Sequence, residues 1–552
     1  MATDKLTPPQ RQHQQRLHRR RMGSHTDCWR LQPILWVLFL FCFDQFVFAA
    51  PNNFLWISDI HLEPYYGTPE AMSLNKLGEF DCSSENKSST HPFGDYGCDA
   101  PQDLVELVLE RSSSLENVDF VIITGDFVRH GTDALPNPMN TTQHILSTVS
   151  DLIKKYHPTI PVIASLGNND VTPDYYLDVD HPEEMLTMVT NGLSTLLGDD
   201  NADAFRLGGY YAQNVTSLMT ILSMNTVLYS INRQPQPQTV QPDPLGQFQW
   251  MEEQLYIAKQ AQRHVYILGH IPPSIGSYRH TQLWQEHYLE TYYQIVANYA
   301  DIIKGHLFGH IHTDEFRFHG GIPLLMASSI TPIYGSNPSV RLVSYNVETS
   351  EVTDYEVHYV DLAETINNNN TALAWKRGES FCQAFGLPDM SVASLQTILD
   401  NLKNTSVTIN FNEEDINASS ITVSSTSSTS TNKSLDYWEI LLSRVHIYTH
   451  GSEVCDKSCQ KEWICTLSSM TAVQYNACLF DKEAAMGWKE WWKITPVRST
   501  ALSLLVALAF FLCVACTVRS FFHKRRDYQV PSGDHHHQSH EEEEGHQLPS
   551  VT

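Results

Sequence analysis

The sequence is poor in basic residues for its length. Its 552 residues contain 36 Lys and Arg against 62 Asp and Glu, which gives a formal net charge of −26. Binding of nucleic acid through general basicity needs clustered Lys and Arg that face phosphates, so we expect no sequence-specific nucleic-acid partner. Internal repeats are also lacking, and the length allows a large core with appendages.

Long hydrophobic runs are scarce, and two stand out. The first, 33–43, follows several arginines and is about a dozen residues long, too short to span a bilayer comfortably. Residues 1–50 therefore suggest a signal peptide, with Met22 as a candidate start, or an uncleaved signal anchor. The second, 499–518, has the length of one transmembrane helix, and the basic residues after it predict that 519–552 form a disordered cytosolic tail.

This topology predicts a single-pass membrane protein whose remaining residues are luminal or extracellular, in the plasma membrane, lysosome or vacuole. Asn-x-Ser/Thr glycosylation sites occur before residue 499 and are lacking in the tail; they begin at Asn86, Asn140, Asn214, Asn369, Asn404, Asn417 and Asn432. In such a compartment most cysteines should form disulfides. Their bunching suggests a leftover Cys382 and three pairs, Cys82–Cys98, Cys455–Cys459 and Cys465–Cys478. The last four could instead ligate zinc.

Short apolar runs alternate with helical patterns through residues 51–363, the predicted catalytic domain. Strands are predicted at 54–58, 119–124, 161–166, 220–224, 265–268, 315–319, 323–327, 340–345 and 352–359. Helices are predicted at 104–111, 144–155 and 248–263. This order predicts an α/β, α+β-layered fold of sheets flanked by helices. A helical extension with a Ser/Thr-rich linker (364–434) and a Cys-rich helical subdomain (435–492) follow.

Five short polar motifs follow predicted strands or occupy turns. In chain order they are Asp59-Ile-His61, Gly125-Asp126, Gly167-Asn168-Asn169-Asp170, Gly269-His270 and Gly309-His310-Ile311-His312. Ligands bind beyond the carboxyl ends of strands in such sheets, so we expect these side chains to converge. Each motif alone is common and means little, but the ordered set is a specific signal.

The motifs supply two aspartates, one asparagine and four histidines as metal donors. These are too many for one tetrahedral ion, but they fit two divalent ions that share one aspartate. Carboxylates and neutral imidazoles suit zinc, iron or manganese, and the nitrogen-rich set favours zinc. Two ions about 3.5–4 Å apart can generate a hydroxide and clamp the phosphoryl oxygens of an in-line displacement.

The ordered motifs resemble those of the calcineurin-like metallophosphoesterases: Asp-x-His, Gly-Asp, Gly-Asn-His-Asp/Glu, Gly-His and Gly-His-x-His. The resemblance covers residues 54–361 and implies a two-sheet β-sandwich flanked by helices. It implies one ion held by Asp59, His61 and His312. The other would be held by Asn168, His270 and His310, with Asp126 as the bridge.

A narrower resemblance is to the acid sphingomyelinase-like phosphodiesterases. Residues 91–101 (HPFGDYGCDAP) are similar to the Gly-x-Tyr-x-Cys-Asp segment of that family, and residues 223–226 and 268–273 and the cysteine-rich C-terminal piece also match. Acid sphingomyelinase carries a saposin-like domain ahead of the catalytic one. Only a few residues separate the predicted signal peptide from Phe54, so we expect that domain to be absent and the chain to resemble the shorter, sphingomyelinase-like branch.

One position departs from the pattern. Many members have a catalytic histidine after the metal-binding asparagine, where this chain has Asn169, which cannot donate a proton as an acid. The sphingomyelinase-like family has a second catalytic histidine four residues after the Gly-Asp aspartate, which is His130 here. The resemblance therefore implies His130 as the general acid, best at mildly acidic pH. The alternative is that His130 is a surface histidine beside the site.

The same region also resembles endopolyphosphatases, through Gly-Asn-Asn-Asp and Gly-Asp-Phe-Val-Arg-His. Arg129 would suit an additional phosphate of a polyphosphate chain, because guanidinium binds phosphate in a bidentate manner. The acidic composition argues against that substrate. We therefore predict hydrolysis of a lipid or small-molecule phosphodiester by attack of a metal-bound hydroxide. Alternatives are an endopolyphosphatase, or a non-catalytic glycosylated surface protein that retains the metal site, for which Asn169 is the hint.

Overall fold

The computed structural model describes residues 52–71, 82–84, 87–236, 239–319, 321–368, 374–404, 436–449 and 455–480. The predicted signal segment, most of the Ser/Thr-rich linker, the predicted transmembrane segment and the tail lie outside these residues. Within the described ranges, no helix is both long and apolar enough to cross a membrane.

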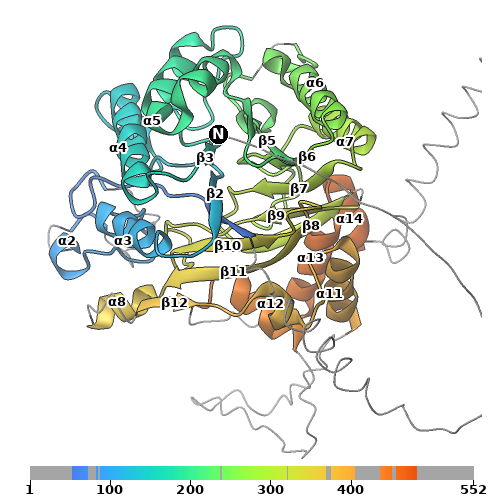
Figure 1. The fold of residues 1–552 in the computed structure, drawn as a ribbon. Helices are drawn as coiled ribbons and strands as arrows, with labels where there is room; N and C mark the ends of the chain where they lie inside the picture. Colours follow the sequence, from blue (N-terminus) through green and yellow to red (C-terminus); the bar gives the residue numbers. More distant parts are fainter. Residues whose placement is uncertain are drawn as a thin grey trace, which may run out of the picture.

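Two six-stranded sheets form the centre of the molecule (Figure 1). The first has the order β12-β11-β10-β1-β2-β3, made of Trp375–Arg377, Val352–Val360, Ser339–Tyr345, Asn52–Ile57, Val118–Ile123 and Val162–Ala164. The second has the order β4-β5-β6-β7-β9-β8, made of Tyr211–Asn214, Met219–Ser223, His264–Leu268, Ile303–Phe308, Ile322–Met326 and Glu315–His319. Both sheets are mixed. The layered arrangement predicted from the sequence is confirmed.

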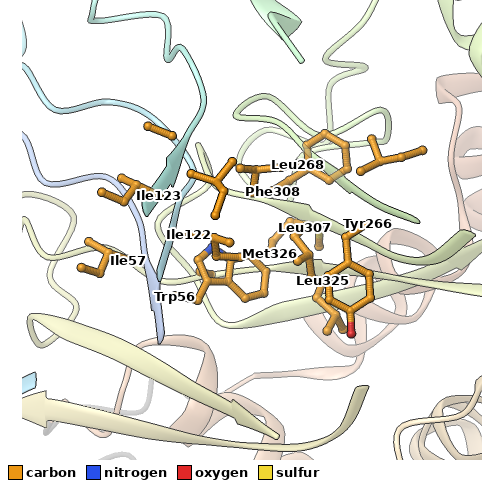
Figure 2. Packing of buried hydrophobic residues seen from close by; sticks show 14 of the residues in the cluster. Trp56, Ile57, Ile122, Ile123, Tyr266, Leu268, Leu307, Phe308, Leu325 and Met326 are labelled. Atoms are coloured by element: carbon orange, nitrogen blue, oxygen red, sulfur yellow. The ribbon is translucent and has the colours of Figure 1, made fainter. Parts of the chain in front are cut away.

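The central strands read as continuous apolar runs because both of their faces are covered. In β1 the five residues from Asn53 to Ile57 are all buried, rather than every second one. Figure 2 shows Trp56 and Ile122 of the first sheet beside Leu307 and Met326 of the second. One face of each sheet therefore packs on the other sheet, and the outer faces pack on helices.

Helices on both outer sides complete the layers (Figure 1). Along the catalytic region they are α2 (Lys87–Thr90), α3 (Gln102–Ser112), α4 (Pro138–Tyr156), α5 (Glu183–Gly208), α6 (Gln247–Gln260), α7 (Glu286–Asn298) and α8 (Leu362–Asn368). α4 buries an apolar stripe that includes Ile145, Val149 and Ile153, at helical spacing, against the core.

Several elements escaped the sequence reasoning, among them α5, α7, β4, β7 and β12. α5 is interrupted at Gly198, whose φ of 68° is not helical, so its apolar pattern changes phase there. β7 contains Gly305 and His306 inside a short apolar run, which masks its strand character. The predicted strand at 315–319 has the same bounds as β8.

The described parts of the predicted helical extension and of the Cys-rich subdomain are helical. The extension contains α10 (Phe381–Phe385) and α11 (Val392–Asn404), and the subdomain contains α12 (Tyr437–Val445), α13 (Lys457–Ser468) and α14 (Ala472–Phe480). The structure contains the disulfides Cys82–Cys98, Cys455–Cys459 and Cys465–Cys478, and Cys382 is free and buried. The four bunched cysteines are therefore cross-linked and do not form a zinc site.

Three of the predicted glycan acceptors lie within the described residues. Asn140, Asn214 and Asn404 are all exposed, so a glycan at each meets no steric barrier from the fold. Their modification stays a prediction. Asn86, Asn369, Asn417 and Asn432 lie outside the described residues.

His157, directly after α4, generates a prediction about stability. It is buried beside the Ser112 hydroxyl, 3.3 Å from its Nε2, and burial lowers its pKa to about 4. The unfolded chain takes up this proton near pH 6.5, whereas the folded chain resists it. The free energy of unfolding should therefore fall as the pH drops from 6.5 towards 4, by about 2 kcal/mol at pH 5.

Urea unfolding at pH 7.5 and pH 5 measures this effect. His157→Gln keeps a polar partner for Ser112 and does not titrate, so its pH dependence should be weaker than that of the wild type. His144→Gln, at an exposed position of the same helix, is the control. An unchanged pH dependence in His157→Gln would contradict the assignment.

Candidate metal centre

The predicted ligands all lie just after strands whose ends meet at one edge of the two sheets. Asp59 and His61 follow β1, Asp126 follows β2, and Asn168 follows β3; β1, β2 and β3 are neighbouring parallel strands. In the second sheet, His270 follows β6, and the Gly-His-Ile-His segment follows its parallel neighbour β7. Parallel neighbours end at the same edge, so segments far apart in sequence converge.

The backbone at the site is strained. Five of the seven predicted ligands have positive φ in the left-handed region: Asp59 (49°), His61 (45°), Asp126 (56°), His310 (73°) and His312 (57°). Such conformations are costly for residues with a side chain and persist where the surrounding structure enforces them, often at functional sites. That most of the predicted donors share this conformation indicates that the fold fixes their direction.

The donor atoms converge on two carboxylates. Oδ2 of Asp126 lies 3.1 Å from Nε2 of His270 and 3.4 Å from Nε2 of His61. Oδ1 of Asp59 lies 3.3 Å from Nε2 of His312. The compact groups that could hold a cation include Asp59, His61 and Asp126 on one side and Asp126, His270 and His310 on the other. Asp126 belongs to both groups, as a bridging ligand would.

Backbone carbonyls orient two of the imidazoles. Nδ1 of His61 donates to the Val128 carbonyl at 2.9 Å, and Nδ1 of His270 donates to the Thr124 carbonyl at 2.6 Å. This fixes the tautomer that turns the Nε2 lone pair of each ring towards the carboxylates. Nε2 of His61 and Nδ1 of His312 are buried without a hydrogen-bond partner among the described residues. The unsatisfied Nε2 of His61, which lies beside the Asp126 carboxylate, fits a divalent cation.

The electrostatics of the site agree with that fit. Burial alone would raise the pKa of Asp59, but His312 and His61 oppose it and lower the pKa to about 2. Burial would lower the pKa of His61 and His270, but the two aspartates raise each to about 9. The carboxylates thus favour positive charge strongly, and divalent ions can supply it in place of the imidazolium protons.

Asp170 and Asn169 hold the loops of the first sheet around Asp126. The Asp170 carboxylate accepts from the backbone N–H groups of Gly167 (2.8 Å), Asp126 (2.9 Å) and Phe127 (2.8 Å). The Asn169 backbone N–H and side-chain amide donate to the two oxygens of Asp126, at 2.8 and 2.9 Å. No role was predicted for Asp170, and Asn169 was predicted at the catalytic edge of the site. In the structure Asn169 donates to the Asp126 carboxylate, and Asp170 holds the backbone around it.

His130 lies against the ligand cluster, and its ring contacts a buried carboxylate on the other side. Its ring stacks on that of His61 at 4.0 Å between centroids, and its Nδ1 lies 3.0 Å from Oδ1 of Asp99. The other oxygen of Asp99 accepts from the His130 backbone N–H at 2.9 Å, and Thr331 donates to Asp99 at 3.1 Å. Asp99 lies in the segment 91–101 that resembles the sphingomyelinase-like family, and no role was predicted for it from the sequence.

Arg129, the predicted substrate-binding residue, is engaged by the protein. Its guanidinium forms an ion pair with Glu63 at 3.0 Å and donates to the Glu70 carbonyl at 2.7 Å, and its Nε donates to the His130 carbonyl at 2.9 Å. The side chain is 3% exposed. These contacts position the backbone of His130, whereas contact with a substrate stays a prediction.

The C-terminal subdomain reaches the loop that carries His312. The Asp314 backbone N–H donates to the Val445 carbonyl at 3.2 Å, and Oδ2 of Asp314 lies 3.4 Å from a guanidinium nitrogen of Arg444. Oδ1 of Asp314 accepts from Arg341 and from the Tyr355 hydroxyl. A buried charge network thus connects α12 to the end of the second sheet.

Comparison with known proteins agrees with this geometry. The calcineurin-like phosphoesterase profile matches residues 53–314. The chain is 30% identical over 367 residues to sphingomyelinase phosphodiesterase D of Dictyostelium discoideum, covering 61% of this chain and 81% of that protein. It is 25% identical over 486 residues to human acid sphingomyelinase-like phosphodiesterase 3b, covering 83% and 95%. For human cyclic GMP-AMP phosphodiesterase SMPDL3A the identity is 26% over 459 residues, covering 78% and 90%.

The two sheets and the donor set between their loops define a metal-dependent phosphoric ester hydrolase. The chain belongs to the calcineurin-like phosphoesterase family, among the sphingomyelinase-like phosphodiesterases. Hydrolysis of a phosphodiester is therefore its reaction class.

Gly167 offers a test of the metal site. A Cβ at this position would overlap the carboxylate and the backbone nitrogen of Asp126, because the two loops approach closely there. Gly167→Ala should displace Asp126 and weaken metal binding by about tenfold or more, a loss typical of disturbed ligand orientation. Metal content after dialysis, measured by mass spectrometry, reports the loss directly, and circular dichroism checks the fold.

Gly305→Ala is the matched control. Position 305 lies in β7, where an added Cβ would make only ordinary contacts, 3.6 Å from the Tyr266 ring. This variant should keep its metal ions. Full metal content in Gly167→Ala would contradict a metal site at Asp126.

Proposed function

We propose that this chain is a dinuclear-metal phosphodiesterase of the acid sphingomyelinase-like type, acting on the luminal or extracellular side of a membrane. The observation that carries the proposal is the sharing of Asp126 between two groups of donors beside the Asp99–His130 pair. Its three disulfides support an oxidising compartment. Relatives named for sphingomyelin and cyclic GMP-AMP support a lipid or nucleotide phosphodiester as the substrate.

We assign one ion to Asp59, His61 and His312, and the other to Asn168, His270 and His310, with Asp126 between them. Four imidazoles among seven donors favour zinc. When bound, two such ions acidify water for attack on phosphorus and neutralise the phosphoryl charge. The chain itself aims the donors through carbonyl contacts and strained backbone, and Asn169 and Asp170 keep the shared carboxylate in place.

His130 supplies the proton that the leaving oxygen needs. Because Asp99 accepts from Nδ1, the other ring nitrogen, Nε2, is the one that remains for the substrate. A buried carboxylate behind the ring fixes the orientation of the imidazole, as a general acid requires. Asn169 cannot act in this way, because a carboxamide is not a general acid, and its side-chain amide donates to Asp126.

An endopolyphosphatase is less well supported. The prediction of an endopolyphosphatase depended on Arg129 as a ligand for an additional phosphate. In the structure the guanidinium of Arg129 is paired with Glu63 and nearly buried. A substrate panel separates the candidates. Bis-(p-nitrophenyl) phosphate, sphingomyelin, ATP and long-chain polyphosphate should be offered at pH 5 and pH 7, with and without chelator. We expect chelator-sensitive diester cleavage; shortening of polyphosphate alone would overturn the proposal.

The assignment of His130 as the acid predicts a dependence on the leaving group. His130→Ala should lower kcat by about 10²–10⁴-fold for a diester with an alkyl alcohol as leaving group. The loss should be much smaller for p-nitrophenol, which leaves readily without a proton. Asp99→Asn should show the same pattern with a smaller loss, since it acts through His130.

Asp95→Asn is the control for Asp99→Asn, because Asp95 also pairs with a histidine, His91, at 2.8 Å. It should leave the leaving-group dependence unchanged. Equal losses for both leaving groups in His130→Ala would remove His130 as the acid and leave it a structural or metal-contacting residue.

A further inference from the structure

His312 lacks the side-chain contact that orients two other imidazoles of the site. Its Nε2 lies 3.3 Å from Oδ1 of Asp59, but its Nδ1 has no hydrogen-bond partner among the described residues. In His61 and His270, by contrast, Nδ1 donates to a backbone carbonyl. The direction of the His312 ring therefore depends on the backbone of its own loop, which holds a left-handed φ of 57° there.

The loop that carries His312 is held at both ends. At its start, the His310 N–H donates to both carboxylate oxygens of Asp59, at 3.1 Å. At its end, directly before β8, the Asp314 N–H donates to the Val445 carbonyl of α12 at 3.2 Å. The second attachment therefore comes from the C-terminal subdomain and not from the two sheets.

The Asp314 side chain lies between two buried arginines that come from different parts of the fold. Its Oδ1 accepts from Arg341 of β10 and, at 2.6 Å, from the Tyr355 hydroxyl of β11. Its Oδ2 has no hydrogen-bond partner among the described residues and lies 3.4 Å from a guanidinium nitrogen of Arg444 in α12. All three charged side chains are at most 2% exposed. A buried carboxylate needs such cations, so removal of Arg444 leaves one oxygen without its partner charge.

Arg444 is itself held in place by several contacts. Its helix α12 lies beside β11 (Figure 1), and the guanidinium lies over the Tyr355 ring, 5.2 Å from the ring centroid. One guanidinium nitrogen donates to the Glu379 carbonyl at 2.8 Å and to the Tyr448 hydroxyl at 3.2 Å. Because these contacts fix the guanidinium, it restrains where the Asp314 carboxylate can lie.

The same network reaches the strand that leads to Asp59. The guanidinium of Arg341 lies over the Trp56 ring of β1, 4.9 Å from the ring centroid. The Trp56 indole N–H donates to the Thr124 hydroxyl at 3.1 Å. That hydroxyl donates to Ser58 at 2.6 Å, and Ser58 donates to the Asp59 carboxylate. One set of buried contacts therefore supports both the loop with the imidazole and the carboxylate opposite it.

We infer that Arg444 is a positioning residue for His312. Through Asp314, it makes the ion held by His312 depend on the C-terminal subdomain. The inference rests on the ligand assignment of the proposed function. The other ion should not depend on Arg444, because the Thr124 carbonyl orients His270.

Metal content tests this inference. The full chain, loaded with two ions, is dialysed against a weak chelator, and the retained metal is measured by mass spectrometry. Arg444→Met keeps the length of the side chain but removes its charge and its donors. It should retain about one ion where the wild type retains two, because disturbed support of a ligand costs about 10–100-fold in metal affinity.

Trp438→Phe is the matched control on the same helix. It removes the hydrogen bond from the buried indole to the Leu402 carbonyl, at 3.2 Å, which joins α12 to α11. This variant should retain both ions, and circular dichroism checks that both variants are folded. Loss of one ion in both would mean that the subdomain acts only through its stability, and would overturn the role of Arg444.

Double variants show which ion is lost. His312→Gln removes one ligand directly, so Arg444→Met/His312→Gln should retain as much metal as His312→Gln alone. Arg444→Met/His270→Gln should lose both ions, because the two changes affect different sites. Additive losses in the first double variant, or equal metal content in His270→Gln with and without Arg444→Met, would overturn the inference.

Arg444→Lys keeps a positive charge against Asp314 and should recover the second ion. A metal content as low as that of Arg444→Met would mean that the ion pair does not position His312.

If Arg444→Met does not fold, Asp314→Asn takes its place. It breaks the same ion pair, while Arg444 keeps the Glu379 carbonyl and Arg341 keeps the Met326 carbonyl as partners. Asp314→Asn should also retain about one ion, for the same reason. Retention of both ions would overturn the inference.

The metal measurement uses no substrate, so it is independent of the proposed reaction. A wild type that holds two ions but cleaves no diester would contradict the proposed function, and the variants would still decide the inference. A wild type that holds fewer than two ions would overturn the ligand assignment and the inference with it.

Discussion

The structure depends on one buried carboxylate, that of Asp126, held between loops of two different sheets. It lies within 3.1–3.4 Å of imidazoles from β1 and β6, and its two oxygens accept from Asn169. Placing a carboxylate in the interior is unfavourable unless cations and donors surround it. The left-handed backbone of the other donors, the close approach at Gly167 and the carbonyl contacts that fix His61 and His270 all serve that requirement.

The C-terminal subdomain contacts the loops of the second sheet that carry candidate ligands. Its α12 contacts Asp314, two residues beyond His312, through Arg444 and the Val445 carbonyl. Its disulfide-linked helices α13 and α14 also contact the segment after His270. The ring of His280 stacks on that of Tyr475, with 4.9 Å between centroids, and its Nδ1 forms a hydrogen bond with the Thr466 hydroxyl at 3.0 Å. Loops from both motifs of the second sheet are therefore supported from outside the catalytic layers.

The candidate ligand cluster has different surroundings at its two ends. At one end the Asp99–His130 pair and the exposed ring of Tyr334 flank His61 and His312. At the other end, Asp174 and Tyr175 connect Asn168 and His310 to an amide-lined pocket. The histidine–carboxylate pair and the pocket thus lie at different ends of the candidate ligand set.

The sequence alone predicted the layered fold, seven candidate donor positions and the three cysteine pairs that the structure contains, because motifs and spacing are local properties of the chain. Most predicted strands were located from their apolar runs, whereas α5 and β7 were hidden by Gly198 and by a glycine and histidine inside a strand. Only the tertiary structure decided what surrounds the donors. In the structure the Asn169 amide donates to Asp126, Arg129 pairs with Glu63, and Asp99 pairs with His130. Backbone hydrogen bonds join Tyr175 to Gln234 in one pocket wall. These contacts join residues separated by up to 66 positions, so no local pattern records them.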